Sequence, residues 1–352
     1  MGVPLVEILS EKNQVFVTSR KPRTSDRQSV QNLQGDAHED AFLTRILEEH
    51  APFDAIVDFM VYHTEEFQAR VPLLLSAARQ YIFLSSSRVY ANSEEPITEA
   101  SPRLLEVSTD RDYLETDEYA LAKARQEDAL ENSGSRNWTI VRPYITYHVR
   151  RLQLGVFEKE RWLFRALHGR TIVFPQQIAE RYTTLTYGGD VAAGISMLAG
   201  NEKAFGEKVH ITAPEPVKWG DALDIYLNTL ERLTGRRTPV LYTQSPQWLR
   251  DVKKNYDAVR YDRLFDRRFD NSKFHSLCGE YPFVPAAQGL RMCLTQFIQQ
   301  NAGFQELHWK YEAYVDRIAG ERTPLREIPG LRNKRRYFAS RWLQKRPHRT
   351  DM

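Results

Sequence analysis

The sequence predicts an α/β fold built on a doubly wound parallel sheet. Short apolar runs rich in β-branched residues alternate with helical stretches through the first half of the chain. Strands that alternate with helices favour right-handed βαβ units, and such units build parallel sheets. With 352 residues, of which 41% are hydrophobic, the chain is long enough to bury a large core.

The elements of the main sheet are expected in the first 150 residues. The expected strands are 14–19, 53–60, 81–85 and 138–142, and the expected helices are 5–9, 39–50, 65–78 and 119–131. After residue 142 the alternation weakens, and further short strands at 170–174, 208–212 and 239–242 suggest a smaller α/β lobe. We therefore expect a nucleotide-binding domain at 1–150, a substrate-binding lobe at 151–325 interleaved with the main sheet, and a basic tail at 326–352.

Composition excludes several classes of protein. No apolar run approaches the ~18–20 residues needed to span a bilayer, and the N-terminus lacks the pattern of a signal peptide, so we expect a cytoplasmic protein. The two cysteines, Cys278 and Cys293, have no closely spaced partner and predict reduced thiols. No His-x-x-x-His pair occurs, and we assign no metal site.

The C-terminal tail concentrates positive charge. Eight basic residues lie in the last 21 positions against one acid, Asp351, and Tyr337, Phe338 and Trp342 are interleaved with them. A solvated terminal helix is the expected structure. Contact with an anionic membrane surface or a nucleic acid is the alternative that the charge leaves open.

Tyr119 and Lys123 are the strongest catalytic candidates. They are four residues apart in the helical run Tyr-Ala-Leu-Ala-Lys, so their side chains project from one face about one turn apart. A lysine ammonium beside a phenol favours the phenolate, which allows tyrosine to exchange protons near neutral pH. Because such a spacing also arises by chance, its context has to support the assignment.

The context is polar residues at the ends of two expected strands. Leu84-Ser-Ser-Ser-Arg-Val-Tyr90 follows an apolar strand, and Arg142-Pro143 ends the strand after the helix that bears Tyr119. Open α/β sheets bind their ligands at the carboxyl ends of the strands. A serine hydroxyl at this edge could hydrogen-bond a reacting oxygen, although a serine cluster also simply ends a strand in a turn.

These motifs, in this order, resemble those of the extended short-chain dehydrogenase/reductase family, the NAD-dependent epimerases and dehydratases, over roughly residues 2–300. The resemblance implies a Rossmann-like sheet, an NAD or NADP cofactor and a nucleotide-sugar substrate. It implies that Tyr119 is the acid/base, that Lys123 tunes it and binds the nicotinamide ribose, and that Ser86 hydrogen-bonds the substrate. Further implied cofactor contacts are Gly2, Asp36, Pro143 and Tyr144.

The sequence departs from the family at its start. Met1-Gly2-Val-Pro resembles only the last glycine of the family's Gly-x-x-Gly-x-x-Gly loop, so the first strand of the sheet is expected to be lacking. We expect a reading frame that begins upstream, or else a chain that binds dinucleotide poorly. Arg20 stands where NAD-specific members carry an acid, which leaves NADP open as the cofactor.

The residues after Ser86 narrow the reaction. In the family's 4,6-dehydratases an Asp-Glu pair follows the equivalent serine, whereas this chain has Ser87 and Arg88. A 4-epimerase is the expected activity, with a one-way ketosugar reductase as the alternative. Five arginines could bind the diphosphate, although each taken alone is more readily interpreted as a surface charge: Arg150, Arg151, Arg161, Arg165 and Arg170.

A homodimer is the expected assembly. A rival hypothesis is a non-catalytic protein on the same fold, because Phe53-Asp-Ala-Ile-Val-Asp58 and the loop at Arg20 also resemble the chloroplast stem-loop-binding proteins, which act on RNA. The basic tail gives this hypothesis some support.

Overall fold

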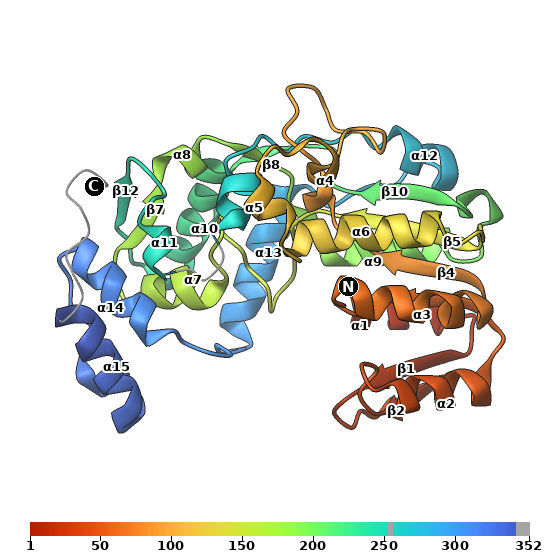
Figure 1. Cartoon of the computed structure of the whole chain (residues 1–352). Coiled ribbons are helices and arrows are strands. Elements are labelled where there is room, and N and C mark those ends of the chain that lie inside the picture. Colours follow the sequence, from red (N-terminus) through yellow and green to blue (C-terminus); the bar gives the residue numbers. More distant parts are fainter. Residues whose placement is uncertain (253–255, 343–352) are drawn as a thin grey trace.

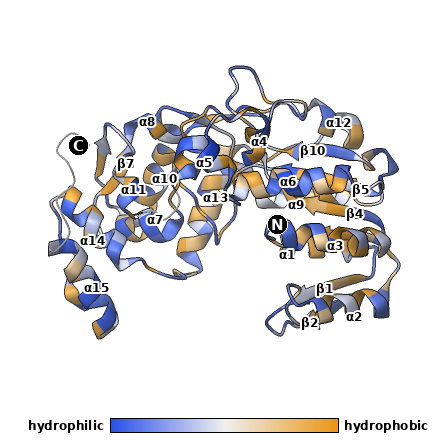
Figure 2. Ribbon diagram, in the orientation of Figure 1, coloured by the Kyte–Doolittle hydropathy of each residue, from blue (hydrophilic) through white to orange (hydrophobic). Residues whose placement is uncertain are grey.

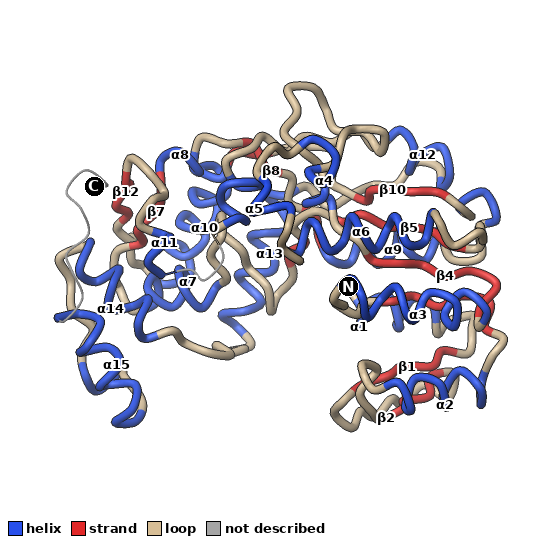
Figure 3. Tube along the Cα trace, viewed as in Figure 1, coloured by secondary structure: helices blue, strands red, loops and turns tan. Residues whose placement is uncertain are grey.

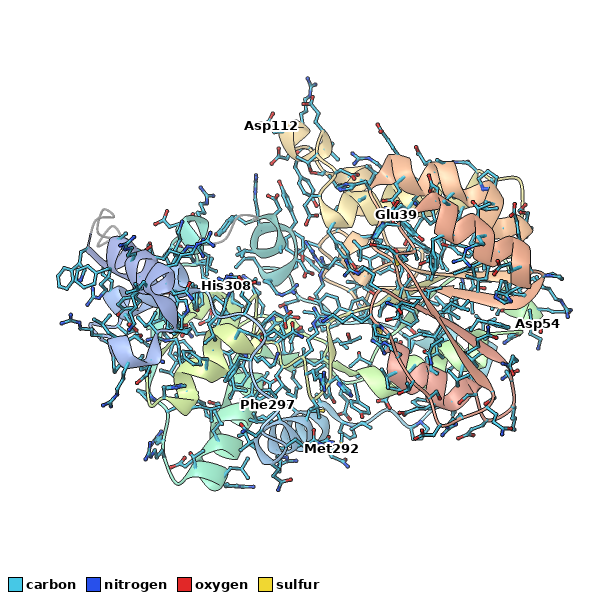
Figure 4. All side chains as sticks on the ribbon, turned by 90° about the horizontal axis from the view of Figure 1, so that it is seen from below. Glu39, Asp54, Asp112, Met292, Phe297 and His308 are labelled. Carbon is cyan, nitrogen blue, oxygen red and sulfur yellow. The ribbon has the colours of Figure 1, made fainter. Side chains whose placement is uncertain are left out.

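The computed structural model describes residues 1–252 and 256–342, and these form two halves that lie side by side (Figure 1). One half carries the main parallel sheet, and the other is mostly helical (Figure 3). Figure 4, turned to view the molecule from below, shows Glu39 and Asp54 in the sheet-bearing half and Phe297 and His308 in the other half.

The main sheet has four parallel strands in the order β10-β5-β4-β3. They are β3 (Phe53–Asp58), β4 (Ala78–Leu84), β5 (Trp138–Pro143) and β10 (Glu207–Ile211). This confirms the α/β class predicted from the sequence. The segment at 208–212, expected among the strands of the smaller lobe, instead forms β10 at one edge of the main sheet, so the chain returns to the sheet after entering the second half.

Helices cover both faces of this sheet. On one face, Tyr81 and Phe83 pack against α2 (Asp40–His50), α3 (Thr64–Ser76) and α6 (Tyr119–Glu131). On the other face, Ile82 and Leu84 pack against α1 (Gly2–Leu9) and α9 (Gly188–Leu198). Because successive residues of a strand point to opposite faces, burial on both sides explains why β4 is a continuous apolar run.

The first two strands form a separate pair. β1 (Val15–Ser19) is parallel to β2 (Val30–Gln34), and within the described residues neither joins the four-stranded sheet. Most side chains of β1 and β3 are only half-buried, although those of β4 are almost all buried. The sheet is therefore divided between β1 and β3, as expected for a doubly wound sheet without its first strand.

Side-chain contacts connect the pair of strands β1 and β2 to the rest of the sheet-bearing half. The ring of Phe16 lies edge-on to Phe53 at a centroid distance of 5.7 Å. Arg27 donates hydrogen bonds to the Glu7 carbonyl at 2.9 Å and to Ser10 Oγ at 2.8 Å, and these atoms belong to α1 and to the residue that follows it. Between β1 and β3, side-chain contacts therefore take the place of the backbone hydrogen bonds that join the strands of a continuous sheet.

We expect the backbone amides of β1 and β2 to exchange with solvent much faster than those of β4 and β5. A two-stranded pair with half-exposed side chains opens at low free energy, whereas interior strands of a four-stranded sheet open near the global unfolding free energy. Native-state hydrogen exchange with mass spectrometry measures this difference. Equal protection in both sets of strands would contradict the division of the sheet.

Short helices and turns follow β4 and lead to α6. They are η1 (Ser87–Val89), α4 (Leu104–Val107) and α5 (Arg111–Leu114). The second half contains the short strands β6 (Thr146–Tyr147), β7 (Ile172–Pro175), β8 (Tyr182–Thr183), β9 (Thr186–Tyr187), β11 (Val217–Lys218) and β12 (Val240–Thr243). The later helices and turns are α7 (Lys159–Leu167), α8 (Gln176–Ala179), η2 (Glu202–Ala204), α10 (Trp219–Thr234), α11 (Leu249–Val252), η3 (Val259–Arg263), α12 (Ser272–Cys278), α13 (Ala286–Gln299), α14 (Trp309–Ile318), η4 (Leu325–Glu327) and α15 (Gly330–Trp342).

Buried ion pairs attach α14 to the second half. Arg165 on α7 is 1% exposed and donates to Glu312 at 2.9 Å and to Asp316 at 2.7 Å, both on α14. Arg170 lies beside them, 3.3 Å from Glu327. Neither arginine is therefore available to bind a diphosphate, and the reading of either as a surface charge is also wrong because both are buried.

The helices give no sign of a membrane span. Among residues 1–252 and 256–342, none is both long enough and apolar enough to cross a bilayer.

Candidate functional site

The three serines after β4 have different surroundings. Ser85 Oγ donates to the carboxylate of Glu127, and Ser87 Oγ donates to the Arg142 carbonyl at 2.8 Å. Ser86 Oγ accepts the Arg88 amide at 3.2 Å and starts the turn η1. Ser85 and Ser87 thus hold the end of β4 in place. Ser86 lines a cavity, which Ser85 also borders.

α6 starts at Tyr119 and carries Lys123 one turn later, as the sequence predicts. The carboxylate of Glu118 caps the helix by accepting the Ala120 amide at 2.8 Å. Alanines at positions 120, 122 and 124 are good helix formers and allow close packing beside the sheet. Tyr119 and Lys123 both line the cavity that Ser86 lines.

A buried ion pair fixes α6 against the sheet beneath these residues. Glu127 on α6 is 0% exposed and accepts two hydrogen bonds from Arg142 at the end of β5, at 2.8 and 2.6 Å. Arg103 also reaches Glu127, at 3.2 Å, and Arg142 donates to the hydroxyl of Tyr90 at 2.8 Å. The ends of β4 and β5 and the helix α6 are therefore held by one hydrogen-bonded network.

The cavity lies at the carboxyl ends of the main strands. Its volume is about 760 Å³, and it brings together Ser86, Tyr119, Lys123, Pro143 and Tyr144. Its far wall comes from the second half and includes Arg161 and His308, the latter labelled in Figure 4. A second cavity, of about 800 Å³, lies between α3 and α6 and contains none of the predicted site residues.

Lys123 is almost completely buried beneath the cavity. Its Nζ lies 4.3 Å from the ring centroid of Phe83 and 3.5 Å from the Met60 carbonyl oxygen. The adjacent loop is held by Asp58, which accepts hydrogen bonds from the Met60 amide at 2.8 Å and from the hydroxyls of Tyr62 and Tyr81 at 2.8 and 2.7 Å. Burial lowers the pKa of Lys123 to about 8, although the carboxylates of Asp58 and Glu127 oppose the shift. At neutral pH the side chain is still mainly an ammonium.

The lowered pKa of Lys123 predicts a pH-dependent difference in stability from the Lys123→Met variant. The unfolded chain holds this proton up to about 10.5 and the folded chain only to about 8. The free-energy cost of burying the charged ammonium is therefore fully present below pH 8. It is relieved as the pH rises, because the folded chain then loses the proton. Between pH 7 and pH 9.5, the unfolding free energy of the parent protein should rise relative to the variant by about 1 to 2 kcal/mol. Urea denaturation at both pH values measures it, and a constant difference would contradict the assignment.

Arg88 is a site residue that the sequence did not identify as one. Its guanidinium lies 5.3 Å from the ring centroid of Tyr119 and 2.8 Å from Glu118. Its Nε is also 3.7 Å from the carboxylate of Asp262 on η3. A cation held over the tyrosine ring in this way restrains the ring, and the carboxylates of Glu118 and Asp262 balance its charge. The position of Arg88 directly after the serines was the signal for it.

The π-helical turn η3 supplies the other residues that the sequence did not reveal. Asp262 accepts hydrogen bonds from Tyr144 at 3.2 Å and from Arg267 at 2.8 Å. Arg263 lines the cavity, donates to the Gly155 carbonyl at 2.9 Å, and has a pKa lowered to about 10 by burial. No motif marks this segment in the sequence.

The remaining predicted cofactor contacts lie away from the cavity lining. Gly2 begins α1, and its neighbour Met1 lines the cavity. Arg20 is exposed after β1, and Asp36, half-buried after β2, accepts the His38 amide at 3.1 Å. Because β1 and β2 are parallel, both residues lie at the carboxyl end of that pair. Their cofactor roles stay predictions.

The arginines suggested for the diphosphate fall into two groups, those that line the cavity and those that do not. Arg151 and Arg161 line the cavity, whereas Arg150 is exposed and outside the lining. Arg165 and Arg170 are held by the acids of the second half. On the side formed by the second half, the cavity is lined by the cations Arg151, Arg161 and Arg263 and by the acids Glu158, Glu160 and Glu306.

Several solved structures share this fold. No protein-family model matches the chain, and no curated protein matches it by sequence. dTDP-glucose 4,6-dehydratase from Bacillus anthracis, solved with NAD, has a TM-score of 0.64 at 14% identity and covers 85% of this chain and 93% of its own. UDP-glucuronic acid 4-epimerase from Bacillus cereus, solved with UDP-glucuronic acid and NAD, has a TM-score of 0.62 at 16% identity, with coverages of 85% and 96%. An epimerase from Methanothermobacter thermautotrophicus gives 0.62 at 14% identity, with coverages of 86% and 90%.

These structures have the fold of the NAD-dependent epimerases and dehydratases, and this chain shares it over most of its length. The fold expected from the ordered motifs is confirmed.

Proposed function

We propose that this protein is an NAD(P)-dependent nucleotide-sugar epimerase of the extended short-chain dehydrogenase/reductase family, acting at a single carbon in the manner of a 4-epimerase. The observation that carries the proposal is that Ser86, Tyr119 and Lys123 line one cavity at the carboxyl ends of the main strands. Similar folds occur in enzymes solved with NAD and UDP-sugars.

The reactive end of the cavity fits a nicotinamide dinucleotide. Pro143 and Tyr144 form its wall at the end of β5, and the buried ammonium of Lys123 suits the ribose hydroxyls. Met1, at the N-terminus of α1, also lines the cavity, and a helix N-terminus favours an anionic group. Gly2, Arg20 and Asp36 would hold the adenosine and pyrophosphate end. Bound NAD(P) would accept a hydride from the sugar carbon and return it.

The protein's own groups would move the proton. Tyr119 would take the hydroxyl proton of the sugar as the carbon is oxidised and return it on reduction. The Lys123 ammonium would stabilise the tyrosinate, and Ser86 would hydrogen-bond the same sugar oxygen. Arg88 restrains the ring of Tyr119 while this exchange takes place.

The residues beside Ser86 support redox chemistry at one carbon over dehydration. Ser87 is buried and donates to the Arg142 carbonyl, and Arg88 is held by Glu118. Neither supplies the acid/base pair that an elimination requires. A one-way ketosugar reductase uses the same residues and differs only in whether the hydride returns, so it is the alternative activity.

The proposal includes the organisation of the chain and its surroundings. Residues 1–150 would bind the dinucleotide and 151–325 the sugar nucleotide, with Arg151, Arg161 and Arg263 facing the diphosphate. A homodimer and a cytoplasmic location belong to the same proposal.

Turnover of sugar nucleotides tests the function directly. The protein would be incubated with NAD or NADP and with UDP-glucose, UDP-glucuronic acid or dTDP-glucose, and the anomeric protons followed by NMR. We expect a new sugar nucleotide epimeric at C4 without net reduction of the cofactor. Net reduction of NAD or NADP, matched by oxidation of the sugar to a ketosugar, would instead favour the reductase running in reverse. Dinucleotide binding without turnover of any sugar nucleotide would contradict both activities.

A further inference from the structure

The C-terminal helix α15 presents one fixed face to the rest of the protein. Tyr337 and Ser340 are buried, and the Tyr337 hydroxyl donates to Asp316 at 2.7 Å and accepts the Thr323 amide at 2.9 Å. Asp316 is itself held by Arg165. These bonds determine which side of α15 faces outward at the periphery of the molecule (Figure 1).

The outward face of α15 carries a stripe of large apolar side chains. Leu331 is 73% exposed, Phe338 48% and Trp342 58%. Their spacing of seven and four residues places them along one line of the helix. The rings of Phe338 and Trp342 lie 6.3 Å apart, so the stripe is continuous at its C-terminal end.

Basic residues border this stripe on both sides. At 100° per residue, Arg332 and Arg336 lie on one side of it, and Lys334 and Arg341 lie on the other. Arg335 lies within it, and residues 330–342 contain no acid. Figure 2 shows hydrophobic and hydrophilic residues interspersed along α15. Arg332, Arg335 and Arg336 are exposed, and none is in an ion pair with another described residue.

We propose that α15 is an interfacial helix that docks the protein on an anionic lipid surface. Its inner face is bonded to the protein, its outer face would enter the boundary between headgroups and acyl chains, and its basic borders would contact lipid phosphates. A nucleic acid explains the apolar stripe less well, because Leu331, its most exposed side chain, gains nothing from phosphates and, unlike Phe338 and Trp342, has no ring to stack on bases.

Vesicle co-sedimentation with the full chain tests the proposal. The probes are extruded vesicles of phosphatidylcholine alone and of phosphatidylcholine with 30% phosphatidylglycerol. We expect partitioning onto the anionic vesicles at least about tenfold stronger than onto the neutral ones, weakening as salt is raised. Equal partitioning onto both vesicles, or none onto either, would overturn the proposal.

Substitutions then assign the binding to α15. The triple change Leu331→Gln, Phe338→Gln and Trp342→Gln should abolish sedimentation with anionic vesicles. Arg332→Gln with Arg336→Gln should weaken it by about tenfold or more. The matched control removes three exposed apolar side chains elsewhere, Val107→Gln, Leu233→Gln and Met292→Gln, and should sediment like the parent.

Two further outcomes would decide against α15 as a membrane helix. One is vesicle binding that survives the triple change. The other is tight binding of a single-stranded RNA 20-mer together with no vesicle binding. Circular dichroism checks that each variant is folded, as expected for side chains on the outward face.

Discussion

Tyr119→Phe is expected to lower the turnover of a sugar nucleotide by about 10²–10⁴-fold and to leave dinucleotide affinity nearly unchanged. The substitution removes only the hydroxyl that would exchange the proton. The ring would stay in place, because Arg88 lies over it and α6 is capped by Glu118 at its start. Stopped-flow kinetics and calorimetric titration with NAD(P) measure the two quantities separately.

The control for this variant is Tyr261→Phe. Tyr261 loses a hydroxyl that donates to Asp110 at 2.6 Å, and it is outside the cavity lining. Its turnover should match that of the parent. If Tyr119→Phe also turned over at the parental rate, the acid/base would have to be another group, and the proposed mechanism would be wrong.

The bounds of the helices and strands around the site could be predicted from the sequence where the local residue pattern was distinctive. The limits of α6, Tyr119–Glu131, agree with the prediction, because alanines and the cap at Glu118 define the helix locally. The strand at β4 was recognisable because both of its faces are buried and its sequence is a continuous apolar run. The strand β2 was missed, since Val-Gln-Asn-Leu-Gln has little apolar character and pairs only with β1.

Features that depend on the tertiary fold were not predictable. Arg263 reaches the cavity from a π-helical turn far along the chain, and no spacing links it to Tyr119. Arg165 and Arg170 look like ordinary basic residues in the sequence, and only the packing of α14 reveals that they are buried with acids. The second lobe was expected to be interleaved with the main sheet, but no local pattern shows that β10 is the segment that returns to it.

Loss of one partner from the buried ion pair between Glu127 and Arg142 should strongly destabilise the sheet-bearing half. Both side chains are buried, at 0% and 1% exposure, and burial would by itself raise the pKa of Glu127. Arg142, Ser85 and Arg103 outweigh that effect and hold the pKa below its ordinary value. The stabilising contribution is therefore present above the ordinary pKa of a glutamate and is lost as the pH falls through the folded-state pKa.

Glu127→Ala is expected to lower the free energy of unfolding by about 3–5 kcal/mol, because Arg142 would remain buried without its counter-charge. The matched control is Glu131→Ala on the same helix. Glu131 is 2.8 Å from Lys208, but both side chains are about one-third exposed, so its loss should cost less than about 1 kcal/mol. Urea denaturation at pH 7 compares the two variants. Equal costs would mean that the buried network does not hold α6, and the position of Tyr119 over the cavity would need another cause.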